Sequence, residues 1–146
     1  MISNKGAMAL RLRCVDWSED YNIGYTLIDN EHKLLFVNAN EFIKAVKHGA
    51  GAEIVHAMLE AMIKYAKSHF YDEEMLMSQL SYYGYLSHKA CHDSFLSVIE
   101  AFQKQFLRGD NITEELAYFM QKWLEDHVSK IDAELRHHIR GGGVEI

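Results

Sequence analysis

Seven histidine and acidic residues share helical faces with apolar side chains in this chain of 146 residues. His32, for example, precedes Leu35 and Phe36 by three and four residues, which is the spacing of neighbours on one face of an α-helix. Glu73 precedes Leu76 by three residues in the same way. We expect all seven to face the interior of the fold: His32, His69, Glu73, His88, His92, His127 and Asp132.

Two of these side chains are carboxylates, and burying an unpaired carboxylate costs many kcal/mol. No lysine or arginine shares the same helical faces, so the chain offers little positive charge to compensate them. A multivalent cation would supply that charge. We therefore predict a metal site. The alternative is an all-protein hydrogen-bond network in which the histidines are satisfied core residues.

The number of candidate ligands indicates two metal ions rather than one. A structural zinc ion takes only four ligands. Two octahedral ions offer about twelve positions, of which the imidazoles, two bridging carboxylates and a bridging oxide or hydroxide would fill about eleven. Mixed imidazole and carboxylate ligation suits iron. A single open position on a redox-active pair would accept one small molecule.

Other residues with similar spacing lie on polar helical faces. His56 and Glu60 are four residues apart, as His69 and Glu73 are, but they stand among acidic neighbours. Glu74 follows Glu73 directly, and its helical neighbours are polar. We interpret these faces as solvated and expect none of His56, Glu60 and Glu74 to take part in the site.

Glycine-containing breaks divide the chain into four segments with the helical period of 3.6 residues. The breaks lie at residues 48–51, 81–87 and 108–111. The helices are predicted at about residues 29–47, 52–80, 87–108 and 111–140. Because the chain has no proline and the connections are short, the predicted fold is all-α, an antiparallel up-down-up-down four-helix bundle.

We expect one domain, with an extended N-terminal arm (1–28), the bundle (29–140) and a loose tail (141–146). Asp29 is predicted to cap the first helix, and Asn111 with Glu114 to form a capping box on the fourth. His137 and His138 are expected at a fraying helix end.

The five-residue spacing of His127 and Asp132 is a geometric problem, because it places them about 140° apart on a regular helix. We predict a local widening of the fourth helix between them, such as a π-bulge.

Composition excludes several classes of protein. The net charge of −6 argues against binding to nucleic acid or to an anionic membrane surface. No apolar run is long enough to span a membrane, and residues 1–14 lack the apolar segment of a signal peptide. The two cysteines, Cys14 and Cys91, are too few for a disulfide framework. We expect a cytoplasmic protein.

The sequence resembles the hemerythrin family, and in particular its bacterial single-domain members, over nearly the whole chain. The resemblance rests on Trp17 and Gly24 in the arm, Ile-Asp-Asn-Glu-His at 28–32, His-Phe-Tyr-Asp-Glu-Glu at 69–74, His-Lys-Ala-Cys-His at 88–92, and Trp-Leu-Glu-Asp-His at 123–127 with Asp132. One departure is Tyr-Tyr-Gly-Tyr at 82–85, where the family often has Tyr-Pro.

The resemblance implies a non-haem di-iron centre with an oxo or hydroxo bridge that binds O₂ reversibly, for transport, storage or delivery. The resemblance implies that His88, His92 and His127 hold one iron, and that His32 and His69 hold a second iron, which has the open position. It further implies that Glu73 and Asp132 bridge the two irons. Trp123 and Leu124 would line an O₂ pocket. For the last two residues, plain core packing is the alternative.

Other functions stay open at this point. The same centre could sense O₂ or redox state and signal to a protein partner, or it could act as an oxidase or peroxidase. Handling of iron or nitric oxide is a further alternative. Ferritin-like oxidases carry Glu-x-x-His pairs and more carboxylates. Here histidines outnumber carboxylates among the candidate ligands, which favours O₂ binding over enzymatic catalysis.

Overall fold

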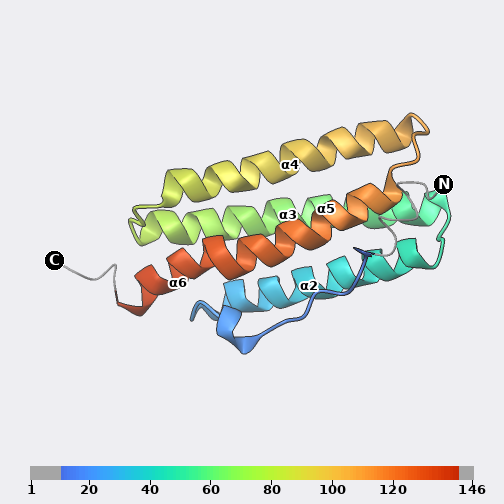
Figure 1. The fold of residues 1–146 in the computed structure, drawn as a ribbon. Helices are drawn as coiled ribbons and strands as arrows, with labels where there is room; N and C mark the ends of the chain where they lie inside the picture. The colour runs from blue at the N-terminus through green and yellow to red at the C-terminus, as the bar shows by residue number, and fades with distance from the viewer. Residues whose placement is uncertain (1–10, 142–146) are drawn as a thin grey trace.

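The computed structural model describes residues 11–141, so the predictions for residues 1–10 and 142–146 lie outside it. Three long helices and a segmented fourth one lie side by side in alternating directions (Figure 1). They are α2 (Thr26–Lys47), α3 (Ala52–Gln79), α4 (Tyr85–Leu107), and a fourth rod made of α5 (Thr113–Asp126), the π-helical segment His127–Ile131 and α6 (Asp132–Arg140). Since residues 11–141 contain no strand, the predicted all-α four-helix bundle is confirmed.

Apolar clusters fill the bundle on either side of a polar layer. α2 packs against α3 and α5, and α4 completes the bundle against the same two helices. Towards the α2–α3 turn the core holds Phe42, Ile43 and Leu59, all fully buried. Towards the α3–α4 turn it holds Met77 and Leu135, which are also fully buried. The seven singled-out polar residues come from the helical turns between these clusters.

The start of α2 differs from the prediction. The helix begins at Thr26, so Asp29 lies inside its first turn and is not the N-cap. Its carboxylate instead accepts hydrogen bonds from the backbone N–H groups of Ile23 (2.7 Å) and Gly24 (3.2 Å). Gly24 has a φ of +100°, which favours glycine. The acidic residue therefore stabilises the turn into the helix rather than the helix end alone.

The predicted capping box on the fourth rod is also wrong. α5 begins at Thr113, and its N-cap position is Ile112, which has no side-chain cap. Glu114 and Glu115 occupy the first turn, where negative charge interacts favourably with the helix dipole. The prediction for the second helix agrees with α3 to within one residue.

The arm is bound to the bundle by two side-chain amides. Asn40 of α2 accepts a hydrogen bond from the Val15 N–H (2.7 Å) and donates one to the Val15 carbonyl (3.0 Å). The buried Gln121 of α5 accepts from the Arg13 N–H (2.8 Å) and donates to the Arg11 carbonyl (3.2 Å). Each amide thus satisfies backbone groups that have no helix or sheet partner.

Replacing Asn40 with alanine is expected to lower the free energy of unfolding by about 1–3 kcal/mol, because it leaves the buried backbone of Val15 unsatisfied. Urea denaturation measures this change. Asn38→Ala on the same helix is the matched control, since Asn38 borders a surface pocket towards α3 instead. An equal loss in both variants would contradict the role assigned to Asn40.

None of the helices in residues 11–141 combines the length and the apolar character that crossing a membrane requires.

Candidate metal centre

All seven predicted residues converge in the interior, and each of the four rods contributes at least one. Glu73, His92 and Asp132 have no measurable exposure, and the other four are at most 5% exposed. The closest cationic or potentially cationic partners of the two carboxylates are histidines. Within residues 11–141, no lysine or arginine forms an ion pair with Glu73 or Asp132.

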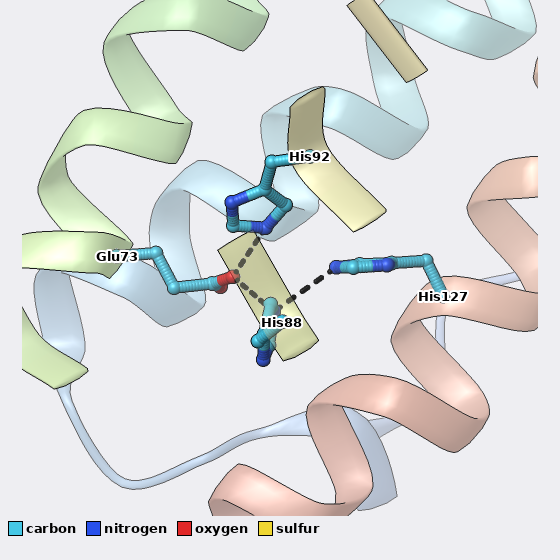
Figure 2. A group of neighbouring side chains, drawn as sticks. All are labelled: Glu73, His88, His92 and His127. Atoms are coloured by element: carbon cyan, nitrogen blue, oxygen red, sulfur yellow. Dashed lines mark hydrogen bonds and ion pairs between the residues drawn. The ribbon is translucent and has the colours of Figure 1, made fainter. Parts of the chain in front are cut away.

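Glu73 divides its two oxygens between two groups of histidines. Its Oε2 atom lies 2.9 Å from His32 Nε2 and 3.4 Å from His69 Nε2. Its Oε1 atom lies 2.8 Å from His88 Nε2 and 3.0 Å from His92 Nε2. Figure 2 shows the second of these groups, with Glu73 and His127 pointing toward the rings of α4. One carboxylate therefore faces two separate sets of nitrogen donors.

Asp132 repeats this division from the opposite helix. Its Oδ2 atom lies 3.3 Å from His32 Nε2, while its Oδ1 atom lies 3.0 Å from His88 Nε2 and 3.2 Å from His127 Nε2. The nitrogen donors thus form a set of two, His32 and His69, and a set of three, His88, His92 and His127. Both carboxylates span the sets.

The spacing of these atoms fits metal coordination better than mutual hydrogen bonding. Neighbouring ligands of an octahedral ion lie about 3.0 Å apart when the metal–ligand bonds are about 2.1 Å long. Four buried atoms, Glu73 Oε1, both oxygens of Asp132 and His92 Nε2, have close neighbours but no hydrogen-bond partner. Orphaned buried polar atoms that converge in this way are what a site for two cations requires.

The fourth rod widens between His127 and Asp132, where the sequence predicts it. Residues His127–Ile131 form a π-helical segment, and the Asp132 N–H donates to the His127 carbonyl, five residues earlier. This wider turn brings His127 and Asp132 onto the same side of the rod, and both reach the centre. The predicted π-bulge is confirmed.

The cluster of ionisable groups is electrostatically self-compensating. Burial opposes charge on Glu73, but the close imidazoles of His32, His69, His88 and His92 hold the pKa of its carboxyl well below its usual range. Burial likewise opposes charge on His69 and His88, but the close carboxylates around them raise their pKa values to about 9 and about 10. The pKa of His127 is lowered, mainly by burial. Without metal, the raised pKa values favour the protonated forms of His69 and His88 beside the two carboxylates.

A family model described as "Hemerythrin HHE cation binding domain" matches residues 23–138, which include all seven residues of the centre. This chain belongs to the hemerythrin family.

Individual relatives agree with this assignment. A bacteriohemerythrin of Pseudomonas aeruginosa is 32% identical over 120 residues, covering 80% of this chain and 76% of its own length. Myohemerythrin of Sipunculus nudus is 32% identical over 116 residues, covering 80% of this chain and 86% of its own length. A crystal structure of a wild-type hemerythrin superposes with a TM-score of 0.78 at 25% identity, covering 88% of this chain and 97% of its own.

Two glutamates of this hemerythrin centre were missed from the sequence. The Glu31 carboxylate lies 2.9 Å from His69 Nδ1, and the Glu74 carboxylate lies 2.8 Å from His92 Nδ1. The sequence predicts Glu74 on a solvated face, but its side chain is only 19% exposed. A carboxylate on the far nitrogen fixes the tautomer and direction of an imidazole, so that Nε2 presents its lone pair to a metal. Both glutamates are adjacent in sequence to a candidate ligand, which is the signal that could have revealed them.

Replacing Glu74 with alanine is expected to lower the affinity for iron about 10–100-fold, because His92 loses the acceptor that orients its ring. Glu74→Gln retains an acceptor oxygen and should recover much of the loss. Competition with a chelator measures the affinity, and Glu100→Ala at an exposed position of α4 is the control. Unchanged affinity in Glu74→Ala would contradict the orienting role.

Aromatic rings cover two of the three histidines in the larger set. Phe70 stacks on His92, with ring centroids 3.9 Å apart and planes within 7° of parallel. Trp123 stacks on His127 at 4.2 Å and 12°. Of the two residues predicted for the O₂ pocket, Trp123 therefore lies against a candidate ligand. Leu124, the next residue of α5, is buried.

One other histidine was interpreted incorrectly. His138 does not lie at a frayed end: it is only 8% exposed, and its ring packs edge-on against Tyr82 at 5.0 Å. Gly84 allows this packing, because a Cβ atom there would lie 2.8 Å from the Tyr82 ring. The sequence Tyr-Tyr-Gly-Tyr at 82–85 therefore closes the α3–α4 turn onto α6.

Proposed function

We propose that this chain binds O₂ reversibly at two iron ions held by His32, His69, Glu73, His88, His92, His127 and Asp132. The observation that carries the proposal is the division of each carboxylate between a set of two and a set of three histidines. Two octahedral ions would offer about twelve positions, of which these seven residues and one bridging oxide or hydroxide would fill about eleven. The position left over would belong to the ion held by the smaller set, His32 and His69. That position would take one small molecule.

Iron held by these residues would supply the electrons for binding O₂, and the protein supplies the enclosure. Phe70 and Trp123 lie flat on the imidazoles of His92 and His127. Leu124, which is 5% exposed, packs with Phe36 and other apolar residues between α2 and α5. These apolar surfaces would limit the access of water and protons to the centre, which favours reversible binding over autoxidation.

The ligand set favours binding over oxidative catalysis. Five imidazoles and two carboxylates leave the centre with fewer anionic donors than the glutamate-rich ferritin-like oxidases have. The names of the relatives, bacteriohemerythrin and myohemerythrin, agree with this class of protein. We propose a non-enzymatic O₂-binding role, and on the low cysteine count we propose the cytoplasm as its compartment.

The test is metal analysis of the purified protein combined with optical spectra over anaerobic reduction and aeration. We expect two irons per chain and an oxygenated spectrum that reverses when O₂ is removed. Rapid consumption of a reductant under air, without a stable oxygenated form, would contradict the binding role and support an oxidase.

Replacing Leu124 with alanine is expected to speed autoxidation, because a smaller side chain admits water and protons to the open position. The decay of the oxygenated spectrum in air measures the rate. Leu116→Ala, at an equally buried α5 position farther from the centre, separates this effect from general loss of packing. Equal decay rates in the two variants would contradict the role assigned to Leu124.

A further inference from the structure

The short helix α6 buries three side chains, and the candidate ligand Asp132 is the first of them. The other two are Leu135 and His138, so the three follow one another at intervals of three residues along one side of the helix. Leu135 is fully buried in the apolar cluster that also holds Tyr82 from the α3–α4 turn. Rotation of α6 about its own axis would therefore move the carboxylate and the two packed side chains together.

The ring of His138 packs against the α3–α4 turn, which lies at the same end of the bundle as α6 (Figure 1). Tyr82 contacts this ring edge-on, with ring centroids 5.0 Å apart, and the Tyr83 ring lies at 5.9 Å. The His138 Nε2 atom also forms a long hydrogen bond of 3.4 Å with the Leu80 carbonyl oxygen. Because Tyr82 and His138 are both buried, the contact between them is shielded from water and restricts the movement of α6.

The same turn determines where α4 begins, three residues before His88. The His88 N–H donates a hydrogen bond of 2.9 Å to the Gly84 carbonyl and so closes the first turn of that helix. A Cβ atom at Gly84 would lie 2.8 Å from the Tyr82 ring, so the ring can occupy its place only beside a glycine. His88 Nε2 in turn lies 3.0 Å from Asp132 Oδ1. One turn therefore positions a ligand on α4 directly and contacts the helix that carries Asp132.

Helix propensity alone does not determine the direction of Asp132, because this residue follows a π-helical turn and π-helices are rare. A change of one residue in the register of that turn would rotate α6 by about 100°. We propose that Tyr82 and His138 are positioning residues for Asp132: their contact fixes the rotation of α6 and keeps the carboxylate between the two sets of histidines. This role rests on the metal-binding function proposed for Asp132, whereas the Tyr82–His138 contact rests on packing alone.

Gly84→Ala tests the proposal, because it displaces the Tyr82 ring and changes neither α6 nor a candidate ligand. Anaerobic competition with a chelator measures the affinity for ferrous iron, which we expect to fall about 10–100-fold, as for other residues that orient a ligand. Gly51→Ala is the matched control, since a Cβ atom there meets nothing within 4 Å. In a Tyr82→Leu background Gly84→Ala should cause no further loss, and Tyr82→Phe, which retains the ring, should bind iron normally. His138→Ala removes the same contact from α6 and serves if Gly84→Ala does not fold.

Amide hydrogen exchange in metal-free protein tests the positioning role without iron. The Asp132 N–H donates to the His127 carbonyl across the π-helical turn, so its exchange should accelerate in Gly84→Ala more than that of the α3 amides. Leu59→Ala, in the apolar cluster at the other end of the bundle, controls for general loss of stability and should leave the iron affinity of the folded protein unchanged.

Three results would overturn the proposal: unchanged iron affinity in Gly84→Ala, an equal loss in Leu59→Ala, or unchanged exchange of the Asp132 amide. A loss of iron affinity in Gly84→Ala, found in a protein that holds two irons but does not oxygenate reversibly, would support the positioning role and contradict the proposed function.

Discussion

Replacing Glu73 with glutamine is expected to leave the protein unable to hold two irons. Glu73 presents Oε2 to His32 and His69 and Oε1 to His88 and His92, so each oxygen faces one metal position. An amide offers only one oxygen, and its NH₂ group would point at the nitrogen donors of the other position. Loss of an outer hydrogen-bond partner already lowers metal affinity about 10–100-fold, so loss of a bridging ligand should exceed about 100-fold.

Iron content after dialysis against a chelator measures this effect, and the oxygenated spectrum should disappear with it. Glu60→Gln is the matched control, because Glu60 is on the same helix and also follows a histidine by four residues, at 3.2 Å from His56, but is exposed. Circular dichroism establishes that the variant is folded. Two tightly held irons in Glu73→Gln would contradict the bridging role.

Metal-free and iron-loaded protein are expected to respond to pH in opposite directions above about pH 6.5. The folded-state pKa values of His69 and His88 are about 9 and about 10, above the ordinary value of 6.5. Their contribution to the metal-free stability is therefore complete below about pH 6.5 and is lost as the pH rises through these values. The pKa of Glu73 is lowered, so its contribution is complete above about pH 4.5 and is lost in acid.

Because the lowered pKa of His127 costs stability in acid, metal-free protein should be most stable towards the upper end of the interval from about pH 4.5 to 6.5. Iron requires neutral imidazoles, so loading releases protons from His69 and His88, and iron affinity rises with pH. Thermal unfolding of both forms from pH 5 to 9 measures the difference in Tm between iron-loaded and metal-free protein. This difference should increase with pH. His69→Gln should flatten the metal-free profile above pH 6.5, whereas His56→Gln should not. Parallel profiles for the two forms would contradict this assignment of protons.

The helices and the interior polar residues could be predicted because both depend on periodicity within one segment. For His32 and Glu73, apolar neighbours three and four residues away indicate that the side chain faces the interior. The π-helical turn could also be predicted, because His127 and Asp132 cannot both reach one site from a regular helix. A functional requirement thus revealed a local backbone feature that propensity alone does not.

What was missed depends on contacts between helices. Glu74 lies among polar residues on its own helix, and only the approach of His92 from α4 turns its side chain into a buried acceptor. His138 is near a chain end but is covered by Tyr82 from a distant turn. Asp29 has the residue type of an N-cap, yet one more turn of helix forms before it. Spacing along one segment contains no information on such partners.

The π-helical segment also determines which changes this part of the chain tolerates. Its four residues after His127, at 128–131, fix the direction of Asp132 by their number rather than by their chemistry. Substitutions among the exposed ones should be accepted, whereas deletion of a single residue would restore the regular pitch and rotate the aspartate out of the bundle. In comparing or engineering such chains, the length of this segment is therefore a more stringent marker of a working site than its amino-acid identity.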